Sequence, residues 1–283
     1  KGAWIVHHAR KISMDVAAPA EYSILDESGK AAELLMRLGA AEEDNLTKAE
    51  VEAIAKSANL NVRTELPHYL QLLQGRRLID TSSDEVQVLG INTRGVLGHA
   101  SDIFDDASPT SREIAAVEIG ELASRSPVLF SEAQEYVGDT YKMKSADAAD
   151  CLSRASEIGF VDAEGDDPTN TLLFNGNLFK RDSVTKSATV LSSLSSAEQT
   201  KLTEVTEMLN TSGCLLATTI ETRLGTPLFE KLKAAGVLEV NTVSNERGEH
   251  AFITLPGAFH KVVNPLIDDS FDMAKSLVSA LAY

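Results

Sequence analysis

One pattern recurs three times along the chain: an amphipathic helix, a glycine or short turn, and then a run of strand-forming residues. It occurs in "YLQLLQGRRLID", in "CLSRASEIGFVDAEG" and in "LFEKLKAAGVLEV". The apolar pairs that follow the three turns lie 82 and 77 residues apart. A period this long predicts repeated domains, because solenoid proteins repeat every 20 to 50 residues or so, roughly half this spacing.

The first copy is predicted to contain three helices followed by a pair of strands. Thr47 and Glu50 have the spacing of a capping box, in which a hydroxyl and a carboxylate satisfy free amides at a helix start. Leu66, Leu70 and Leu73 have the spacing of a core-facing helix face. The apolar spacing then changes to two, which indicates strands. The predicted elements are helices over "SGKAAELLMRLGA", "LTKAEVEAIAKSANL" and "RTELPHYLQLLQG" and strands over "RRLID" and "EVQVL".

The second and third copies repeat this order. Ser131 is expected to open the middle helix of the second copy, and Thr226 to cap the last helix of the third copy, with Pro227 in its first turn. Between copies, "GHASDIFDDASPT" is predicted to be a linker, and "NLFKRDSVTKSATVLSSLSS" a linker or a short helix. The other predicted helices are "SREIAAVEIGELASR", "SEAQEYVGDTYKM", "SADAADCLSRASEIG", "SAEQTKLTEVTEMLN", "LLATTIETRLG" and "TPLFEKLKAAG", and the strand pairs are "FVDAEG" with "TLLFNG" and "VLEVNTV" with "EHAFITL".

Three helices followed by two strands is the order of a winged helix-turn-helix domain, and the chain resembles tandem proteins of this superfamily. The resemblance implies an α+β, helix-rich fold with three tandem winged-helix domains, short antiparallel hairpins and a C-terminal helix. The alternative is one shared α/β sheet, in which single helices and single strands alternate. The expected segments are an N-terminal segment over 1–28, in which "AWIVHHARKI" is predicted as a strand, winged helices over 29–95, 111–177 and 195–257, and a C-terminal helix over 266–283.

The sequence lacks the motifs of common enzymes. It has no glycine-rich dinucleotide loop, Walker lysine loop, zinc-protease histidine pair or nucleophile-elbow serine. His7 and His8 are adjacent, so in a strand their rings would point to opposite faces and could not easily share a metal. No catalytic residue, metal or cofactor is therefore assigned, and an enzyme is the least favoured class of function.

The composition also limits the location of the chain. No apolar run approaches the roughly 20 residues of a membrane span, and the amino end lacks the features of a secretory signal. These features predict a cytoplasmic protein without a membrane partner, associated with nucleoid or chromatin if it binds DNA. The net charge of −16 opposes binding to nucleic-acid phosphates.

The resemblance implies that the third helix of a copy enters the major groove and that the hairpin, or wing, touches the DNA backbone. The windows 61–77, 142–159 and 221–236 carry net charges of +2, 0 and +1, so the first and third copies are the better candidates. Asp147 and Asp150 place negative charge on the third helix of the second copy, so this copy is expected to be a spacer or a dimerisation unit. The candidate nucleic-acid-binding residues are Asn61, Arg63, His68, Gln71, Arg76, Arg77, Arg223, Thr226, Lys231 and Arg247.

The sequence favours two functions. The first is a DNA-binding regulatory or accessory protein that uses the third helices of copies one and three on duplex DNA. The second is an acidic scaffold of tandem winged helices that binds protein within a larger assembly, as in endosomal sorting complexes and in subunits that grip kleisins. A protein partner or a homodimer is expected under both.

Overall fold

The computed structural model describes residues 1–41, 45–82, 85–89, 93–167, 169–179, 181–245 and 248–256. The protein is α+β and helix-rich, with three small antiparallel sheets of three strands each among these residues. It divides into two compact units. The first comprises Lys1–Glu118 with Glu157–Phe160, and the second comprises Ile119–Ser156 and the chain from Val161 onward.

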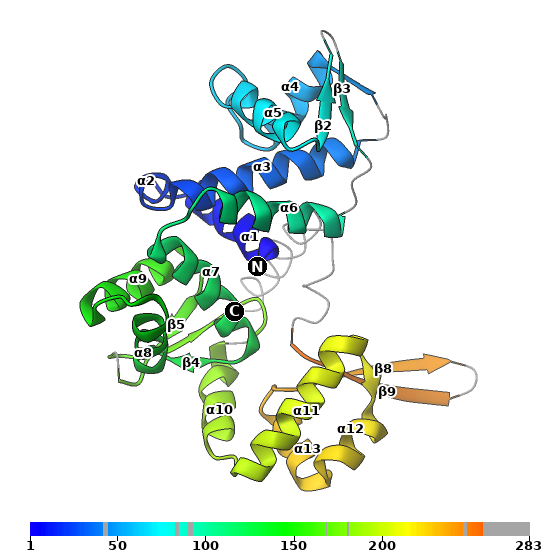
Figure 1. The fold of residues 1–283 in the computed structure, drawn as a ribbon. Coiled ribbons are helices and arrows are strands. Elements are labelled where there is room, and N and C mark those ends of the chain that lie inside the picture. The colour runs from blue at the N-terminus through cyan, green and yellow to red at the C-terminus, as the bar shows by residue number, and fades with distance from the viewer. Residues whose placement is uncertain are drawn as a thin grey trace. The chain divides into compact units, whose positions relative to one another are not determined.

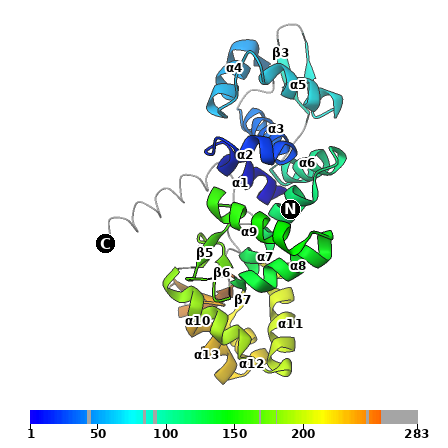
Figure 2. The same ribbon diagram turned by 90° about the vertical axis from the view of Figure 1, so that its left-hand side faces the viewer.

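Three helices of the first unit pack directly against one another, as Figures 1 and 2 show. Glycine permits two of these close approaches. A Cβ atom on Gly29 would lie 2.2 Å from the Cβ of Ala9 and 2.8 Å from the carbonyl oxygen of Ile5. A Cβ atom on Gly2 would lie 1.9 Å from the carbonyl oxygen of Leu97. The helices are α1 (Gly2–Ile12), α3 (Ser23–Gly39) and α6 (Thr93–Asp106), and the short α2 (Ala18–Glu21) precedes α3.

Three expectations for this bundle differ from the structure. The strand predicted over "AWIVHHARKI" is the helix α1, in which Ile5, Ala9 and Ile12 recur at helical spacing and are buried. The linker predicted over "GHASDIFDDASPT" lies largely in α6, which buries Ile103 and Phe104 while its aspartates face solvent. The predicted module start at residue 29 also falls inside α3.

The helical form of α1 brings His7 and His8 together, contrary to the prediction for a strand. Their Nδ1 atoms lie 3.3 Å apart, and His8 Nε2 lies 3.1 Å from the carbonyl oxygen of Ala116. Because a carbonyl only accepts, His8 Nε2 must carry the proton, and His7 Nδ1 must donate to His8 Nδ1. The fully buried His8 ring stacks on Phe160, with ring centroids 4.2 Å apart.

The first sheet follows α3 in the chain. The predicted capping box is confirmed: the amide of Glu50 donates to Thr47 Oγ1, and the amide of Thr47 donates to Glu50 Oε2. The predicted strand pair is also confirmed, but the sheet has an additional short strand, and its order is β1-β3-β2. The elements are β1 (Asn45–Thr47), α4 (Lys48–Ser57), α5 (Leu66–Gly75), β2 (Ile79–Thr81) and β3 (Glu85–Val88).

The second sheet has the same arrangement, with order β4-β6-β5. The expectation that Ser131 opens the middle helix is wrong, because α8 begins at Phe130 without a side-chain cap. The segment "NLFKRDSVTKSATVLSSLSS", predicted to be a linker or a short helix, contains a helix of 12 residues. The elements are α7 (Ser111–Arg125), β4 (Val128–Leu129), α8 (Phe130–Tyr141), α9 (Ser145–Ile158), β5 (Asp162–Glu164), β6 (Leu172–Phe174) and then α10 (Arg181–Ser192).

The third sheet has order β7-β9-β8, and β8 and β9 extend as a hairpin away from the helices (Figure 1). Thr226 does not cap the last helix as predicted. Gly225 is the N-cap, and the Thr226 hydroxyl donates to Glu221 Oε1 at 2.9 Å instead. The elements are α11 (Ser196–Ser212), β7 (Leu215–Leu216), α12 (Ala217–Leu224), α13 (Thr226–Ala234), β8 (Glu239–Asn245) and β9 (Gly248–Thr254).

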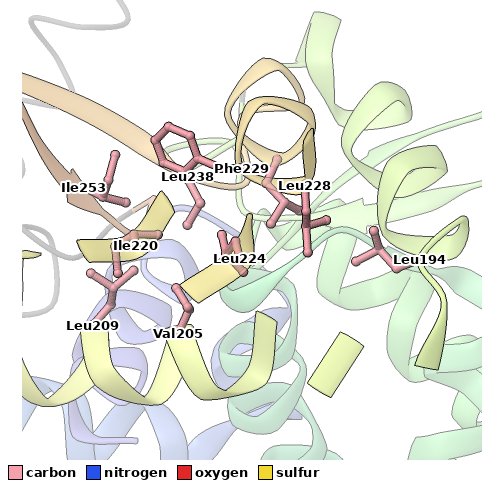
Figure 3. Close-up of a cluster of buried hydrophobic side chains, with 10 residues drawn as sticks. Leu194, Val205, Leu209, Ile220, Leu224, Leu228, Phe229, Leu238 and Ile253 are labelled. Carbon is pink, nitrogen blue, oxygen red and sulfur yellow. The ribbon is translucent and has the colours of Figure 1, made fainter. Parts of the chain in front are cut away.

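A compact apolar cluster holds the third sheet to its helices. Figure 3 shows side chains of α11, α12 and α13 packed together with Leu238, which precedes β8, and Ile253 of β9. Leu232 and Ile253 are fully buried, so β9 is fixed against the helices by side-chain packing. The cluster consists of Leu194, Val205, Leu209, Ile220, Leu224, Leu228, Phe229, Leu232, Leu238 and Ile253.

The three sheets thus belong to runs with one element order: helix, strand, helix, helix, strand, strand. We call α3 to β3, α7 to β6 and α11 to β9 the first, second and third modules. In each described sheet the last strand lies between the other two. The helix predicted over 266–283 lies outside the described residues, as does Arg247.

Candidate nucleic-acid interface

Helix α5 of the first module has one face in the core and one in solvent. Leu66, Tyr69 and Leu73 are buried, whereas Leu70, which was predicted on the core face, is only half-buried. The residues between the buried positions are exposed because a helix alternates its faces with a period of about 3.6 residues. The exposed side chains are those of Pro67, His68, Gln71 and Gln74.

The turn before α5 is built by Asn61. Its Oδ1 accepts hydrogen bonds from the backbone amides of Arg63 and Thr64 at 2.9 and 3.1 Å. Its own amide donates to Glu65 Oε2 at 2.7 Å, while Lys30 Nζ lies 3.2 Å from Glu65 Oε1. Asn61 therefore shapes the turn, and Glu65 pairs with Lys30 of α3, which also pairs with Asp26 at 2.8 Å.

Two of the predicted contact residues are engaged inside the first unit. His68 Nε2 lies 2.6 Å from Glu27 Oε1 on α3. Arg76 Nη1 forms an ion pair of 3.0 Å with Asp106 Oδ2 at the end of α6. These contacts hold α5 and the chain after it to the helical bundle, so His68 and Arg76 position the helix.

The other predicted residues of this module remain available. Arg63, Gln71 and Arg77 are exposed, and no side-chain hydrogen bond or ion pair joins them to another described residue. Arg63 and Arg77 lie beyond opposite ends of α5, whose ten residues span about 15 Å. The two exposed arginines are therefore separated by the length of the helix.

Arg77 has an unusual backbone conformation. Its φ is 58°, in the left-handed region that favours glycine. The amides of Arg77 and Leu78 donate to the carbonyls of Gln74 and Leu73, which is the hydrogen-bond pattern of a Schellman motif. Gly159 and Gly236, with φ of 86° and 74°, occupy the same position in the second and third modules. The first module thus holds an arginine where its two counterparts hold glycine.

The corresponding helix of the third module offers less to an anion. Arg223 is exposed and has no partner among the described residues. Lys231 Nζ donates to Ser193 Oγ at 2.9 Å, which directs it toward the end of α10. On the exposed face of α13, Glu230 pairs with Lys233 at 2.6 Å. Arg223 is therefore the remaining candidate contact among the described residues of this module.

Helix α9 of the second module has an acidic exposed face. Asp147, Asp150 and Glu157 are all exposed on it. Of the three corresponding helices α5, α9 and α13, only α5 has no carboxylate among its own exposed residues. This difference separates the first module from the other two.

Some features of the interface were not predicted. Gln74 lies three residues after Gln71 on the same exposed face, and this spacing is visible in the sequence. Lys48 and Lys56 on α4 are also exposed. Residues 45–82 carry five Lys or Arg and four Asp or Glu, whereas the whole first module, residues 23–88, carries seven and twelve, so only the part around α4 and α5 is slightly basic.

Searches of protein-family models, curated proteins and solved structures find no match to this chain. Within the described ranges, no group of three or more His, Cys, Asp or Glu side chains could hold a metal ion. A search of the same ranges finds no helix with the length and apolar character needed to cross a bilayer.

Proposed function

We propose that this chain is a DNA-binding regulatory or accessory protein built from tandem winged helices, and that its first module holds duplex DNA. The element order of each module and the sheet order, with the last strand in the middle, support the winged-helix assignment. In this arrangement α5 is the helix that enters the major groove.

The observation that carries the proposal is the exposed face of α5 between Arg63 and Arg77. A major groove about 12 Å wide admits a helix and is bordered by phosphates on both sides. Two unpaired arginines beyond the ends of a 15 Å helix (about ten residues at 1.5 Å each) suit phosphates on the two borders. The residues of α5 itself bring no carboxylate to this face, and the partly exposed carboxylate beside it, that of Glu27 on α3, is paired with His68. Arg223 of the third module is proposed as a further phosphate contact.

Removing both flanking arginines tests this function. For Arg63→Ala with Arg77→Ala, we expect affinity for any duplex to fall at least tenfold or so at moderate salt, since charge-assisted hydrogen bonds contribute about 1.5 kcal/mol or more each. The slope of log affinity against log salt should decrease by about two, or about one for Arg223→Ala. Fluorescence anisotropy with labelled duplexes at several salt concentrations measures both quantities.

A matched control removes the same charge elsewhere. Lys144 and Lys186 are exposed and lie outside the first module. Lys144→Ala with Lys186→Ala should leave the salt slope unchanged. Equal slopes for the wild type and the Arg63, Arg77 variant, or no retention of any duplex at low salt, would contradict the proposal.

Because the backbone of Arg77 is strained, a change at this residue should affect stability and DNA binding in opposite directions. Arg77→Gly should raise the free energy of unfolding by about 0.5 to 1 kcal/mol, because glycine adopts the left-handed conformation without steric cost. The same change should weaken DNA binding about tenfold through loss of the guanidinium. Urea unfolding and anisotropy on one preparation check both effects. A more stable variant with unchanged affinity would remove Arg77 from the interface.

A protein scaffold is the second candidate function, and the acidic face of α9 favours it. Asp147, Asp150 and Glu157 would repel phosphates but would suit a basic protein surface. The exposed Val240 and Val243 on β8 add apolar contact area to the third module. This function predicts that the chain does not bind duplexes even at low salt, and that Asp147→Lys disrupts a complex with a basic partner.

A further inference from the structure

The exposed face of α5 carries two uncommitted glutamine side chains. Gln71 and Gln74 are three residues apart, so they are neighbours on one side of the helix. Neither forms a side-chain hydrogen bond with another described residue. His68, the other polar residue on this side, is held by Glu27. The face therefore presents two side-chain amides without partners among the described residues.

We infer that Gln71 and Gln74 select adenine, so that the first module prefers neighbouring A·T pairs in the major groove. This inference rests on the proposed function. A glutamine amide can donate to adenine N7 and accept from adenine N6, which forms two hydrogen bonds with one base. Guanine presents acceptors at both N7 and O6, so the amide oxygen would face an acceptor.

The spacing of the two residues sets the length of the preferred site. Three residues rise about 4.5 Å along a helix, and base pairs stack about 3.4 Å apart. Gln71 and Gln74 therefore reach adjacent or nearly adjacent base pairs. Arg63 and Arg77 would fix the helix on the backbone without reading the sequence, because phosphate contacts carry no direct base information.

The inference is tested by selection from a pool of duplexes with a random central segment, using the full chain. The enriched duplexes should contain adenine at two adjacent positions. The preference over guanine at each position should be about 5- to 100-fold. Replacing each selected adenine with 7-deazaadenine, which lacks the N7 acceptor but pairs normally with thymine, should abolish most of this preference.

Protein variants provide the second arm of the test. Gln71→Ala with Gln74→Ala should lose the preference for the selected duplex but retain the wild-type affinity for an unrelated duplex. Gln87, an exposed residue on β3, is the matched control, and Gln87→Ala should keep the preference.

The outcomes distinguish the inference from the proposed function. Salt-dependent binding without an adenine preference, or with a preference unaffected by 7-deazaadenine, overturns the inference and leaves the proposed function standing. Failure to bind any duplex at low salt overturns both. Loss of affinity for all duplexes in the glutamine variant would show that these residues stabilise the fold or bind the backbone, and would also overturn the inference.

Discussion

Gly29→Leu is expected to destabilise the first unit by about 3 kcal/mol or more. The new side chain would enter the contact between α1 and α3, where even a Cβ atom lies 2.2 Å from Ala9 Cβ and 2.8 Å from the backbone oxygen of Ile5. Overpacking of a rigid contact costs about 1 to 3 kcal/mol, and more when backbone must move. Urea unfolding followed by the fluorescence of Trp4, the single tryptophan and part of α1, measures the change.

A second glycine provides the control for Gly29. Gly98 lies in α6, is exposed, and has no atom within 4 Å of its would-be Cβ. Gly98→Ala should therefore raise stability by about 0.5 to 1 kcal/mol, because alanine favours the helix. A Gly29→Leu protein that unfolds at the wild-type urea concentration would contradict the close packing of α1 on α3.

The bundle also determines where the candidate interface lies. Helix α3 contributes Glu27, which contacts His68, and Lys30, which contacts Glu65. Both contacts join the bundle to α5 or to the turn before it. Loss of the α1–α3 contact is therefore expected to reduce duplex binding as well, although neither helix is proposed to touch DNA.

Elements with strong local signals were predictable from the sequence. The Thr47–Glu50 capping box needs only residues within one helical turn, and it is confirmed. The alternating residues of β8 and β9 predicted their hairpin, which is also confirmed. In both cases the interactions that stabilise the element lie close together in sequence.

Elements that depend on distant partners were missed. β1, β4 and β7 have only two or three residues each, too few to display a strand period, and each exists because it pairs with the last strand of its sheet. Helix α1 was assigned as a strand because its short apolar run is ambiguous without its partner α3.

The candidate site shows the same division. Exposure of Gln71 follows from the helical pattern of the sequence. The engagement of His68 by Glu27, 41 residues away, could not be predicted from it. The left-handed backbone of Arg77 could have been predicted, because alignment of the three repeats places Arg77 opposite Gly159 and Gly236.

Acid is expected to destabilise the first unit through His7 and His8. Burial lowers the pKa of His7 from 6.5 to about 4, and the positive charges of Lys11 and Arg10 act in the same direction. Burial also lowers the pKa of His8 well below 6.5, and the charge of His7 lowers it further. The hydrogen bond to Ala116 acts in the opposite direction but does not offset these effects. Both rings are therefore neutral in the folded protein at pH 6, as their hydrogen bonds require.

The direction of the pH effect follows from proton uptake in the two states. Unfolded histidines bind protons near pH 6.5, whereas folded His7 does so only near pH 4. Between these values the unfolded state holds more protons, so stability is complete above pH 6.5 and decreases as the pH falls toward 4. A shift of this size for His7 corresponds to about 3 kcal/mol. Burial raises the pKa of Asp26, which has the opposite effect on stability as pH falls.

The test compares the pH dependence of unfolding in the wild type and in His7→Gln with His8→Gln. Glutamine does not titrate but can donate a hydrogen bond to Ala116, and Asp26 contributes equally to both proteins. The free energy of unfolding, measured by circular dichroism in urea, should fall less steeply between pH 6.5 and 4 in the variant. Histidine NMR signals provide a direct check on the folded wild type, because those of His7 and His8 should not shift between pH 7.5 and 5.5. Parallel stability curves, or a ring that titrates near pH 6.5, would mean that protonation does not oppose the packing of α1, since a charged imidazole would then be accommodated in the folded state.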